Sequence, residues 1–159
     1  MRESLVALKL VLDELEVPTS IGTLSDRKLV QKAVFLAKHA GVDLGYSYGW
    51  YVYGPYSPAL TRDYFALDES LQTEETSTTW TLRNEAKLLL ANAKPLLVPP
   101  AETDLDRSQW AELVASLLYF QDDLKLDAAA ARAEISLKKP HLVDYVDAAE
   151  AAIAESGIH

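Results

Sequence analysis

The chain has 159 residues, of which 49% are hydrophobic and 25% charged, and it contains no cysteine. This length suits one well-buried core rather than two, and the composition excludes wholesale disorder. The lack of cysteine excludes disulfides, thiol nucleophiles and cysteine-metal sites from this sequence. No apolar run approaches the roughly 20 residues of a membrane span, and the first residues lead into an amphipathic helix rather than a signal peptide. We therefore expect a cytoplasmic protein with no membrane partner.

The net charge of −9 is unevenly distributed along the chain. Residues 1–60 contain six Lys or Arg and six Asp or Glu, whereas residues 61–159 contain nine and eighteen. Nucleic-acid affinity comes mainly from cations on phosphates, so the acidic second part disfavours binding along DNA or RNA. It suits a basic protein partner better, although solubility alone also explains it.

Helical periodicity dominates the start of the chain. Residues 2–16 carry leucines at helical spacing, and Pro18 ends the run. A second helix is predicted after Ser25, which can act as its cap, and Gly41 stops it. Its apolar face consists of Leu29, Ala33, Leu36 and Ala40.

An aromatic segment follows the second helix. Residues 48–53 predict a strand, because aromatics and glycine disfavour a helix there, and Gly54-Pro55 predicts a turn. Ser57 can cap a third helix that starts at Pro58 and runs to about residue 71. The polar residues 72–79 predict a loop or hairpin tip, followed by a short strand over 78–82 and a helix over 84–93.

The composition changes after residue 94. Residues 95–105 read as an extended linker, and Asp106 can cap a strongly apolar helix over 107–121. Asp127 can cap an alanine-rich helix. Pro140 opens a last helix that Gly157 closes, with Leu142, Val146, Ala149 and Ile153 on one face.

These elements predict a mainly α fold with a small β element. The order helix, helix, strand, helix, strand, helix in the first part indicates a winged-helix-like lobe over residues 1–94, with 78–82 as its wing strand. Residues 95–105 link it to a C-terminal helical lobe over 106–157, packed on it as one compact unit. The third helix carries one arginine against three carboxylates, which is poor chemistry for a DNA-reading helix.

Motifs for catalysis, cofactors and metals are missing from the sequence. The six glycines form neither G-x-x-x-x-G-K nor G-x-G-x-x-G, G-x-S-x-G is absent, and the three histidines show no ligand spacing. We therefore predict no catalytic, cofactor or metal residues. Lys138, Lys139 and His141 cluster at a helix start, where they are either structural or a small basic patch that faces a partner.

The segment "WYVYGPYSPAL" at residues 50–60 is the most distinctive stretch of the chain. Alternation along a strand sends Trp50 to one face and Tyr51 and Tyr53 to the other, so both faces are aromatic or apolar. Exposed, these rings and the rigid Gly-Pro corner would bind a protein; covered, they belong to the core. Periodicity favours the core, because aromatic clusters are more often core than interface.

A family resemblance rests on this segment together with "LVQKAVFLA" at residues 29–37. The pair resembles the signature of the YwgA-like bacterial proteins, and over the first half it is similar to the Panacea, or SocA-like, antitoxin domain. In both groups a lysine-containing helix precedes an aromatic strand that ends in Tyr-Gly-Pro. The likeness to YwgA-like proteins continues through "QWAELVASLLYF" and "KKPHLVDYVDAAEAAI".

The resemblance implies toxin neutralisation or adaptor activity, in which a toxin is handed to a protease. We therefore predict a non-enzymatic interaction module: an antitoxin, an adaptor or a defence-system accessory subunit, with a toxin, a protease or a defence-complex subunit as partner. The resemblance carries over Gln31, Lys32, Trp50, Tyr53, Gly54, Pro55 and Pro58 as partner-binding candidates, to which the aromatic character of the segment adds Tyr51 and Tyr56.

Two alternatives stay open. The first is a winged-helix DNA-binding regulator that uses Arg27, Lys28, Lys32 and Lys38 on the second helix and dimerises through the C-terminal helices. The second is an enzyme whose site is assembled from scattered residues, among them His141, Asp144, Tyr53 and Arg62.

Overall fold

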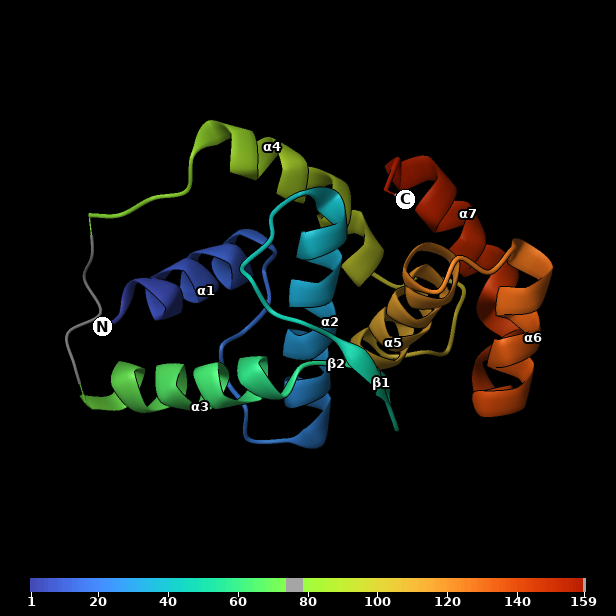
Figure 1. Cartoon of the computed structure of the whole chain (residues 1–159), viewed down its shortest axis with the longest axis horizontal. Coiled ribbons are helices and arrows are strands. Elements are labelled where there is room, and N and C mark those ends of the chain that lie inside the picture. Colours follow the sequence, from blue (N-terminus) through green and yellow to red (C-terminus); the bar gives the residue numbers. More distant parts are fainter. Residues whose placement is uncertain (74–78, 159) are drawn as a thin grey trace.

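The computed structural model describes residues 1–73 and 79–158. The sequence predicted a mainly α fold with a small β element. Seven α-helices and one two-stranded antiparallel sheet in this part of the chain confirm that fold class. Figure 1 shows α2 at the centre of the first four helices and α5 between α2 and the last two helices. The α-helices are α1 (Glu3–Glu14), α2 (Leu24–Ala40), α3 (Pro58–Thr73), α4 (Asn84–Ala93), α5 (Arg107–Leu118), α6 (Ala128–Lys138) and α7 (Val146–Ser156).

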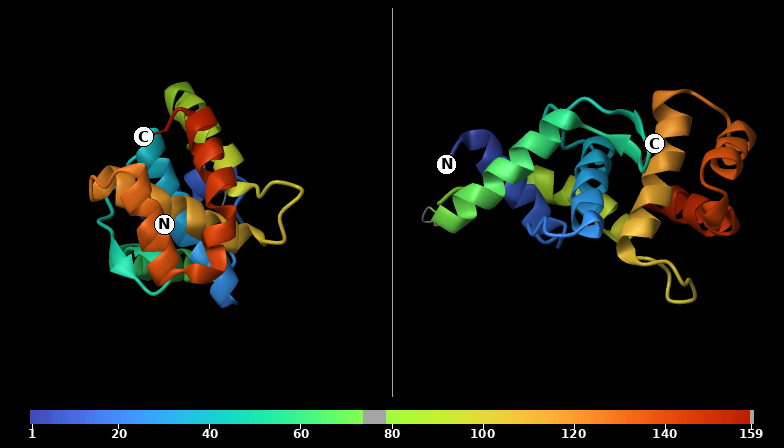
Figure 2. Two further views of the ribbon diagram at one scale, coloured as in Figure 1. Left: turned by 90° about the vertical axis from the view of Figure 1, so that its right-hand side faces the viewer. Right: turned by 90° about the horizontal axis from the view of Figure 1, so that it is seen from below.

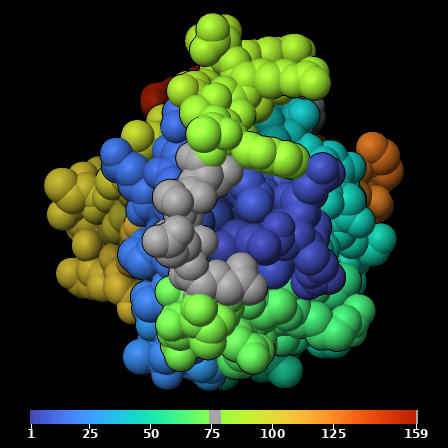
Figure 3. Space-filling view, turned by 90° about the vertical axis from the view of Figure 1, so that its left-hand side faces the viewer, coloured from blue at the N-terminus to red at the C-terminus, as the bar shows by residue number. Residues whose placement is uncertain are grey.

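The first helix forms as its leucine spacing predicts. Leu5, Leu8, Leu12 and Leu15 are all buried on the side that faces the core. Figure 3 views the end of the molecule where α1 lies between α3 and the start of α4. The packing of α1 on both neighbours explains why a helix with only twelve residues is stable here.

The second helix begins two residues earlier than predicted, because its cap is Thr23 and not Ser25. The Thr23 hydroxyl accepts a hydrogen bond from the Asp26 backbone N–H (3.0 Å), and the Asp26 carboxylate accepts one from the Thr23 N–H (3.2 Å). This reciprocal capping box satisfies two unpaired donors at once, which a lone Ser25 could not do. The helix ends at Gly41 as predicted, with φ of 110°.

Both strands of the sheet come from the aromatic segment. β1 (Gly49–Tyr51) pairs with β2 (Gly54–Tyr56), and Val52 and Tyr53 form the connection between them. The predicted turn at Gly54-Pro55 is therefore wrong: Gly54 takes φ of 95° and starts the second strand. Pro55 stands opposite Trp50, and because only alternate antiparallel pairs exchange hydrogen bonds, its missing N–H is tolerated there.

The prediction of a wing strand at 78–82 is also wrong over its described residues, 79–82. Residues 79–82 have no strand structure, while residue 78 lies outside the described part, as does most of the predicted hairpin tip. β1 pairs instead with β2 of its own hairpin, within the described part of the chain. The helix α4 that follows has the predicted bounds.

The segment between α4 and α5 is only partly the extended linker that was predicted. It begins as a 3-10 turn, η1 (Lys94–Leu97), in which Leu96 and Leu97 are buried in the core. Asp106 caps α5 as predicted, in a capping box with Gln109. Buried side chains of the two predicted lobes belong to one hydrophobic cluster, because α5 packs directly against α2.

The C-terminal helices differ from prediction at two ends. The helix predicted over 107–121 is α-helical only to Leu118 and continues as a π-helical segment, η2 (Tyr119–Asp123). The last helix starts as a 3-10 segment, η3 (Pro140–Tyr145), before α7. Its predicted apolar face, Leu142, Val146, Ala149 and Ile153, is buried, and η3 packs against both α6 and α7 at the C-terminal end of the molecule, which Figure 2 shows from two further sides. No helix in the described part is long and apolar enough to span a bilayer.

Candidate functional site

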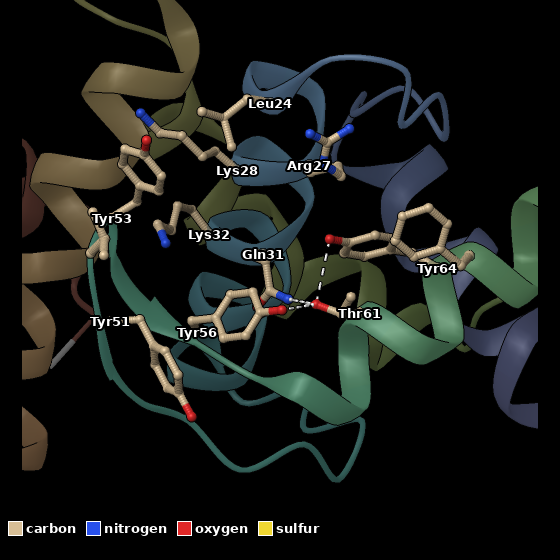
Figure 4. A pocket seen from close by; sticks show the side chains of 12 residues that line it. Leu24, Arg27, Lys28, Gln31, Lys32, Tyr51, Tyr53, Tyr56, Thr61 and Tyr64 are labelled. Atoms are coloured by element: carbon tan, nitrogen blue, oxygen red, sulfur yellow. Dashed lines mark hydrogen bonds between the residues drawn. The ribbon is translucent and has the colours of Figure 1, made fainter.

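A pocket of about 360 Å³ lies between α2, the hairpin and α3. Figure 4 shows Lys28, Lys32 and Tyr53 on one side of it, Thr61 and Tyr64 on the other, and Gln31 between them. Its size lies within the range of about 300–1,000 Å³ that is usual for ligand sites. The lining side chains are Leu24, Arg27, Lys28, Gln31, Lys32, Tyr51, Val52, Tyr53, Tyr56, Thr61, Tyr64 and Phe65.

Gln31 fixes the hairpin and α3 relative to α2. Its amide oxygen accepts a hydrogen bond from the Ser57 N–H (2.9 Å), and its amide nitrogen donates to Ser57 O and to Thr61 Oγ1 (3.0 Å each). The Thr61 hydroxyl in turn donates to the phenol oxygen of Tyr56 (2.6 Å). Gln31 is buried, so these bonds form away from water, where an unpaired amide would be costly.

Lys32 lies at the floor of the pocket and is almost fully buried, with 1% of its surface exposed. Its ammonium group donates to Pro55 O at 2.8 Å. No second acceptor is found in the described residues, although an ammonium group carries three N–H donors. The pKa of Lys32 falls to about 7, mainly because burial disfavours the charged amine; Glu112 opposes this shift, and Lys139 and Lys28 add to it.

Glu112 lies behind Lys32 and holds two other lysines. Its carboxylate pairs with Lys28 (2.6 Å) and with Lys139 (2.7 Å), and the carboxylate and Lys139 are both almost completely buried. Lys139 also donates to Val52 O in the hairpin turn (3.1 Å). Three lysines and one carboxylate thus share this buried cluster, which leaves an excess of positive charge beside the pocket.

The rim of the pocket is apolar and exposed. Eleven large hydrophobic side chains are exposed in the described part of the chain, and five of them border this pocket: Leu24, Tyr51, Val52, Tyr53 and Phe65. They come from three elements, the start of α2, the hairpin and α3. Tyr53 also lies under the Lys28 ammonium group, 4.8 Å from the ring centroid, which fixes the ring at the rim.

Some of the predicted partner-binding residues line the pocket at the surface, and others are buried beneath it. Tyr51 and Tyr53 are exposed and Tyr56 is half-buried, and all three line the pocket. Trp50 instead stacks on Phe120 (4.6 Å between ring centroids) from within the core side of the hairpin. Gly54 and Pro55 are buried, and Pro58 is exposed at the start of α3 but does not line the pocket. The segment is thus partly core and partly surface, so neither single interpretation holds for all of it.

The secondary cluster of Lys138, Lys139 and His141 does not form a single patch. Lys138 and His141 are exposed, whereas Lys139 is buried against Glu112. Lys138 pairs with Glu134, one turn earlier on α6. Only Lys139 therefore reaches the neighbourhood of the pocket, and it does so from behind.

Leu24, Thr61, Tyr64, Phe65 and Glu112 were not predicted as site residues from the sequence. The first four carry no local signal, because the pocket forms only where the start of α3 meets α2, through the hydrogen bond from Gln31 to Thr61. Glu112 did carry a local signal. It is the one charged residue between Trp110 and Leu118, inside an otherwise apolar stretch of helix. A charge on a buried helix face requires partners, and that fact could have pointed to the lysines of α2.

The structure gives the positions of the residues that the two alternatives name. Of the four basic residues on α2, Lys32 is buried, Lys28 pairs with Glu112, Lys38 donates to Tyr46 O (3.3 Å) and Arg27 donates to Ile21 O (2.9 Å). Arg27, Lys28 and Lys32 converge on the pocket, whereas Lys38 lies outside it. Of His141, Asp144, Tyr53 and Arg62, only Tyr53 lines the pocket. Within residues 1–73 and 79–158, no three His, Asp or Glu side chains are placed to hold a metal ion.

The fold and the pocket define a mainly helical protein with an aromatic, cationic cleft on one face. No family model and no curated protein matches the chain, and neither does any solved structure.

Proposed function

We propose that this protein is a non-enzymatic protein–protein interaction module of the antitoxin, adaptor or defence-accessory kind, and that it binds its partner through the pocket between α2, the hairpin and α3. The partner is a toxin, a protease or a subunit of a defence complex, and the complex forms in the cytoplasm. One observation carries the proposal: within residues 1–73 and 79–158, five of the eleven exposed large hydrophobic side chains border a single pocket.

The exposed rim supports a protein partner rather than a small molecule. Apolar patches around a concave site usually mark binding surfaces. Val52, with 81% of its surface exposed, and Phe65, with 50%, lie on the rim and not at the floor. A ligand confined to the pocket would leave such side chains in water, whereas a protein surface would cover them.

The supports of the rim favour tight binding. Gln31 ties the hairpin and α3 to α2, and Lys139 holds the hairpin turn through Val52 O. Tyr51, Tyr53 and Tyr56 are thereby presented on a braced turn, so little conformational freedom remains to be lost on binding. Tyrosines in this setting are common hot spots of protein interfaces. The resemblance to the Panacea group, which carries over Gln31, Lys32 and Tyr53 among others, points in the same direction.

A site-specific crosslinking experiment tests the proposal. Val52→p-benzoylphenylalanine places a photoreactive group on the rim, and Leu88→p-benzoylphenylalanine is the matched control, because Leu88 is an exposed apolar residue of α4 outside the pocket. In the native cells we expect one dominant protein crosslinked from position 52 and not from position 88. The crosslink should map to one segment of that protein and disappear when Tyr53→Ala and Phe65→Ala are added.

Two results would overturn the proposal. Equal crosslinking from positions 52 and 88 would mean that the rim has no partner of its own. A crosslink from position 52 to nucleic acid would replace the module by the DNA-binding alternative. Circular dichroism of the Tyr53→Ala, Phe65→Ala chain shows that a lost crosslink reflects the surface and not unfolding, since both rings are substantially exposed.

A further inference from the structure

The pocket collects positive charge and contains no carboxylate of its own. Arg27, Lys28 and Lys32 all line it, and no Asp or Glu is among its lining residues in the described part of the chain. The nearest compensating carboxylate, Glu112, is already shared between Lys28 and Lys139. The acidic second part of the sequence suggested a basic partner, but at this face the sign is reversed.

Lys32 is the residue that points to a ligand. It is more than nine-tenths buried, lines the pocket floor, and uses one of its three donors, on Pro55 O. Burying a lysine among other lysines without a full set of acceptors is unfavourable. An anion that entered the pocket would supply the missing acceptors and the missing charge.

The apolar rim indicates which kind of anion the pocket binds. A free inorganic anion would gain nothing from Leu24, Tyr53 and Phe65, whereas an acidic residue flanked by apolar ones would cover them. We propose that the pocket receives the side-chain carboxylate of a Glu or Asp in a partner protein's segment, paired with Lys32 at the floor while apolar neighbours of that residue lie on the rim. The inference rests on the proposed function and names the chemistry of its partner.

The acidic remainder of the molecule sharpens this recognition. Residues 61–159 carry the whole excess of negative charge, so an acidic segment is repelled over much of the surface and attracted where the α2 cations converge. Arg27 stands at the pocket with its guanidinium bonded only to Ile21 O in the described residues, and its other N–H groups are available to guide the incoming carboxylate.

Binding of a carboxylate has a proton signature. The charged and titratable groups around Lys32 and its pocket are Arg27 and Lys28 on α2, Glu112 on α5, Lys139 after α6, the phenols of Tyr51, Tyr53 and Tyr56 in the hairpin, and the phenol of Tyr64 on α3. With a pKa of about 7, Lys32 is mostly neutral at pH 8 in the free protein. A carboxylate at the pocket floor favours the charged amine, so its arrival at pH 8 draws a proton from the buffer.

Defined peptides test the inference with the whole protein. The probes are acetylated and amidated heptapeptides with a central Glu or Asp between Leu, Phe and Tyr residues, each paired with the same peptide carrying Gln or Asn. A further arm uses Gln peptides with a free C-terminal carboxylate. We expect the acidic peptides to bind at least about tenfold more tightly than their amide partners, as is typical for a buried charge pair. Calorimetry at pH 8 in phosphate and in Tris should show proton uptake.

Lys32→Met should abolish both the preference for acidic peptides and the proton uptake. Lys87→Met is the matched control, because Lys87 is an exposed lysine of α4 that lies outside this pocket, and it should change neither. A merely structural role of Lys32 would weaken the binding of acidic and amide peptides alike. Loss of the acidic preference together with the proton uptake would therefore assign Lys32 a direct role.

Each contrary result has one meaning. Equal binding of acidic and amide peptides, lost in the Tyr53→Ala, Phe65→Ala chain, would overturn the inference and leave the interaction module standing. Binding of the free-carboxylate peptides alone would assign the pocket to a chain terminus instead of a side chain. Failure of every peptide to bind would overturn the inference, while the crosslinking experiment decides the proposed function independently.

Discussion

At the scale of single residues, the molecule tolerates an unfavourable group at its pocket. Lys32 is buried with a single hydrogen-bond acceptor in the described residues, and its pKa falls from 10.5 to about 7. In its charged form such a group lowers the free energy of unfolding. Residues of binding sites commonly destabilise the fold in this way because they serve function. The pH dependence of folding stability should reveal it.

Lys32→Met should remove a definite part of that pH dependence. Between pH 7 and 10.5 the unfolded chain binds a proton at Lys32 that the folded chain does not, so the free energy of unfolding of the natural protein rises with pH across this window. The variant lacks this contribution. We expect its advantage over the natural protein to shrink by up to about 1.4 kcal/mol per pH unit as pH rises from 7 to 10.

Urea unfolding of both chains at intervals over this pH range measures the difference. Taking the difference between the two proteins cancels the contributions of the ionisable groups that both chains share. A stability difference that stays constant from pH 7 to 10 would mean that Lys32 titrates like an exposed lysine.

Gly54 is a second residue whose role is specific to its place. It has φ of 95°, and a Cβ atom added there would lie 2.7 Å from Ser116 Oγ on α5. Gly54→Ala should therefore destabilise the protein by more than the about 1–2 kcal/mol that a left-handed alanine costs. Gly45→Ala is the matched control, because Gly45 has φ of 92° but open space around its Cβ position.

Thermal or urea unfolding of the two variants measures the excess. Ser116→Ala removes the atom that the new Cβ would meet, and Ser116 Oγ has no hydrogen-bond partner in the described residues, so that change alone should cost little. In the Ser116→Ala background, Gly54→Ala should cost no more than Gly45→Ala. An unchanged excess would place the strain elsewhere.

At the scale of elements, α5 anchors the pocket from behind. The Glu112 carboxylate on α5 pairs with Lys28 of α2 and with Lys139, which follows α6. Lys139 in turn donates a hydrogen bond to Val52 O in the hairpin turn. One carboxylate thus connects four parts of the chain that are far apart in sequence. Because the pair partners are buried, their loss is more serious than that of a surface ion pair.

Glu112→Gln should destabilise the protein by about 3–5 kcal/mol, since it leaves the buried Lys139 and the partly buried Lys28 without a counter-charge. The same change at Glu134, which pairs with Lys138 across one turn of α6 at a partly exposed site, should cost less than about 1 kcal/mol. Chemical denaturation at pH 7 compares the two. Similar costs for both variants would show that the Glu112 cluster is solvated and not buried.

At the scale of the whole molecule, the two predicted lobes share one core. α2 packs on α5, and Leu96 and Leu97 of the predicted linker belong to the same hydrophobic cluster. A lobe cut away from the other would expose the apolar side of its central helix. Independent folding of either lobe is therefore not expected.

The full chain should unfold in a single transition, and a fragment of residues 1–94 should show no cooperative unfolding alone. Far-ultraviolet circular dichroism and tryptophan fluorescence should give coincident curves for the full chain. Mixing the fragment with residues 95–159 should restore the native spectrum. A fragment 1–94 that melts cooperatively by itself would mean that the chain consists of two independent domains.

The sequence by itself determined the helices and most of their ends. Leucine spacing, Asp106, Asp127, Gly41 and Gly157 act on their own neighbourhood, so their effects can be read without knowing the rest of the fold. It also marked residues 50–60 as unusual. These features depend on interactions within one or two turns of the chain.

The tertiary structure decided the hairpin and the pocket. Gly54 and Pro55 look like a turn in sequence, but become a strand because Trp50 packs on Phe120 and Gln31 holds Ser57, contacts that span 26 residues or more. Whether an aromatic ring was core or surface depended on where α5 and α3 came to lie. The charge state of Lys32 likewise depends on burial among groups from distant segments, and burial is a property of the packed molecule and not of the local sequence.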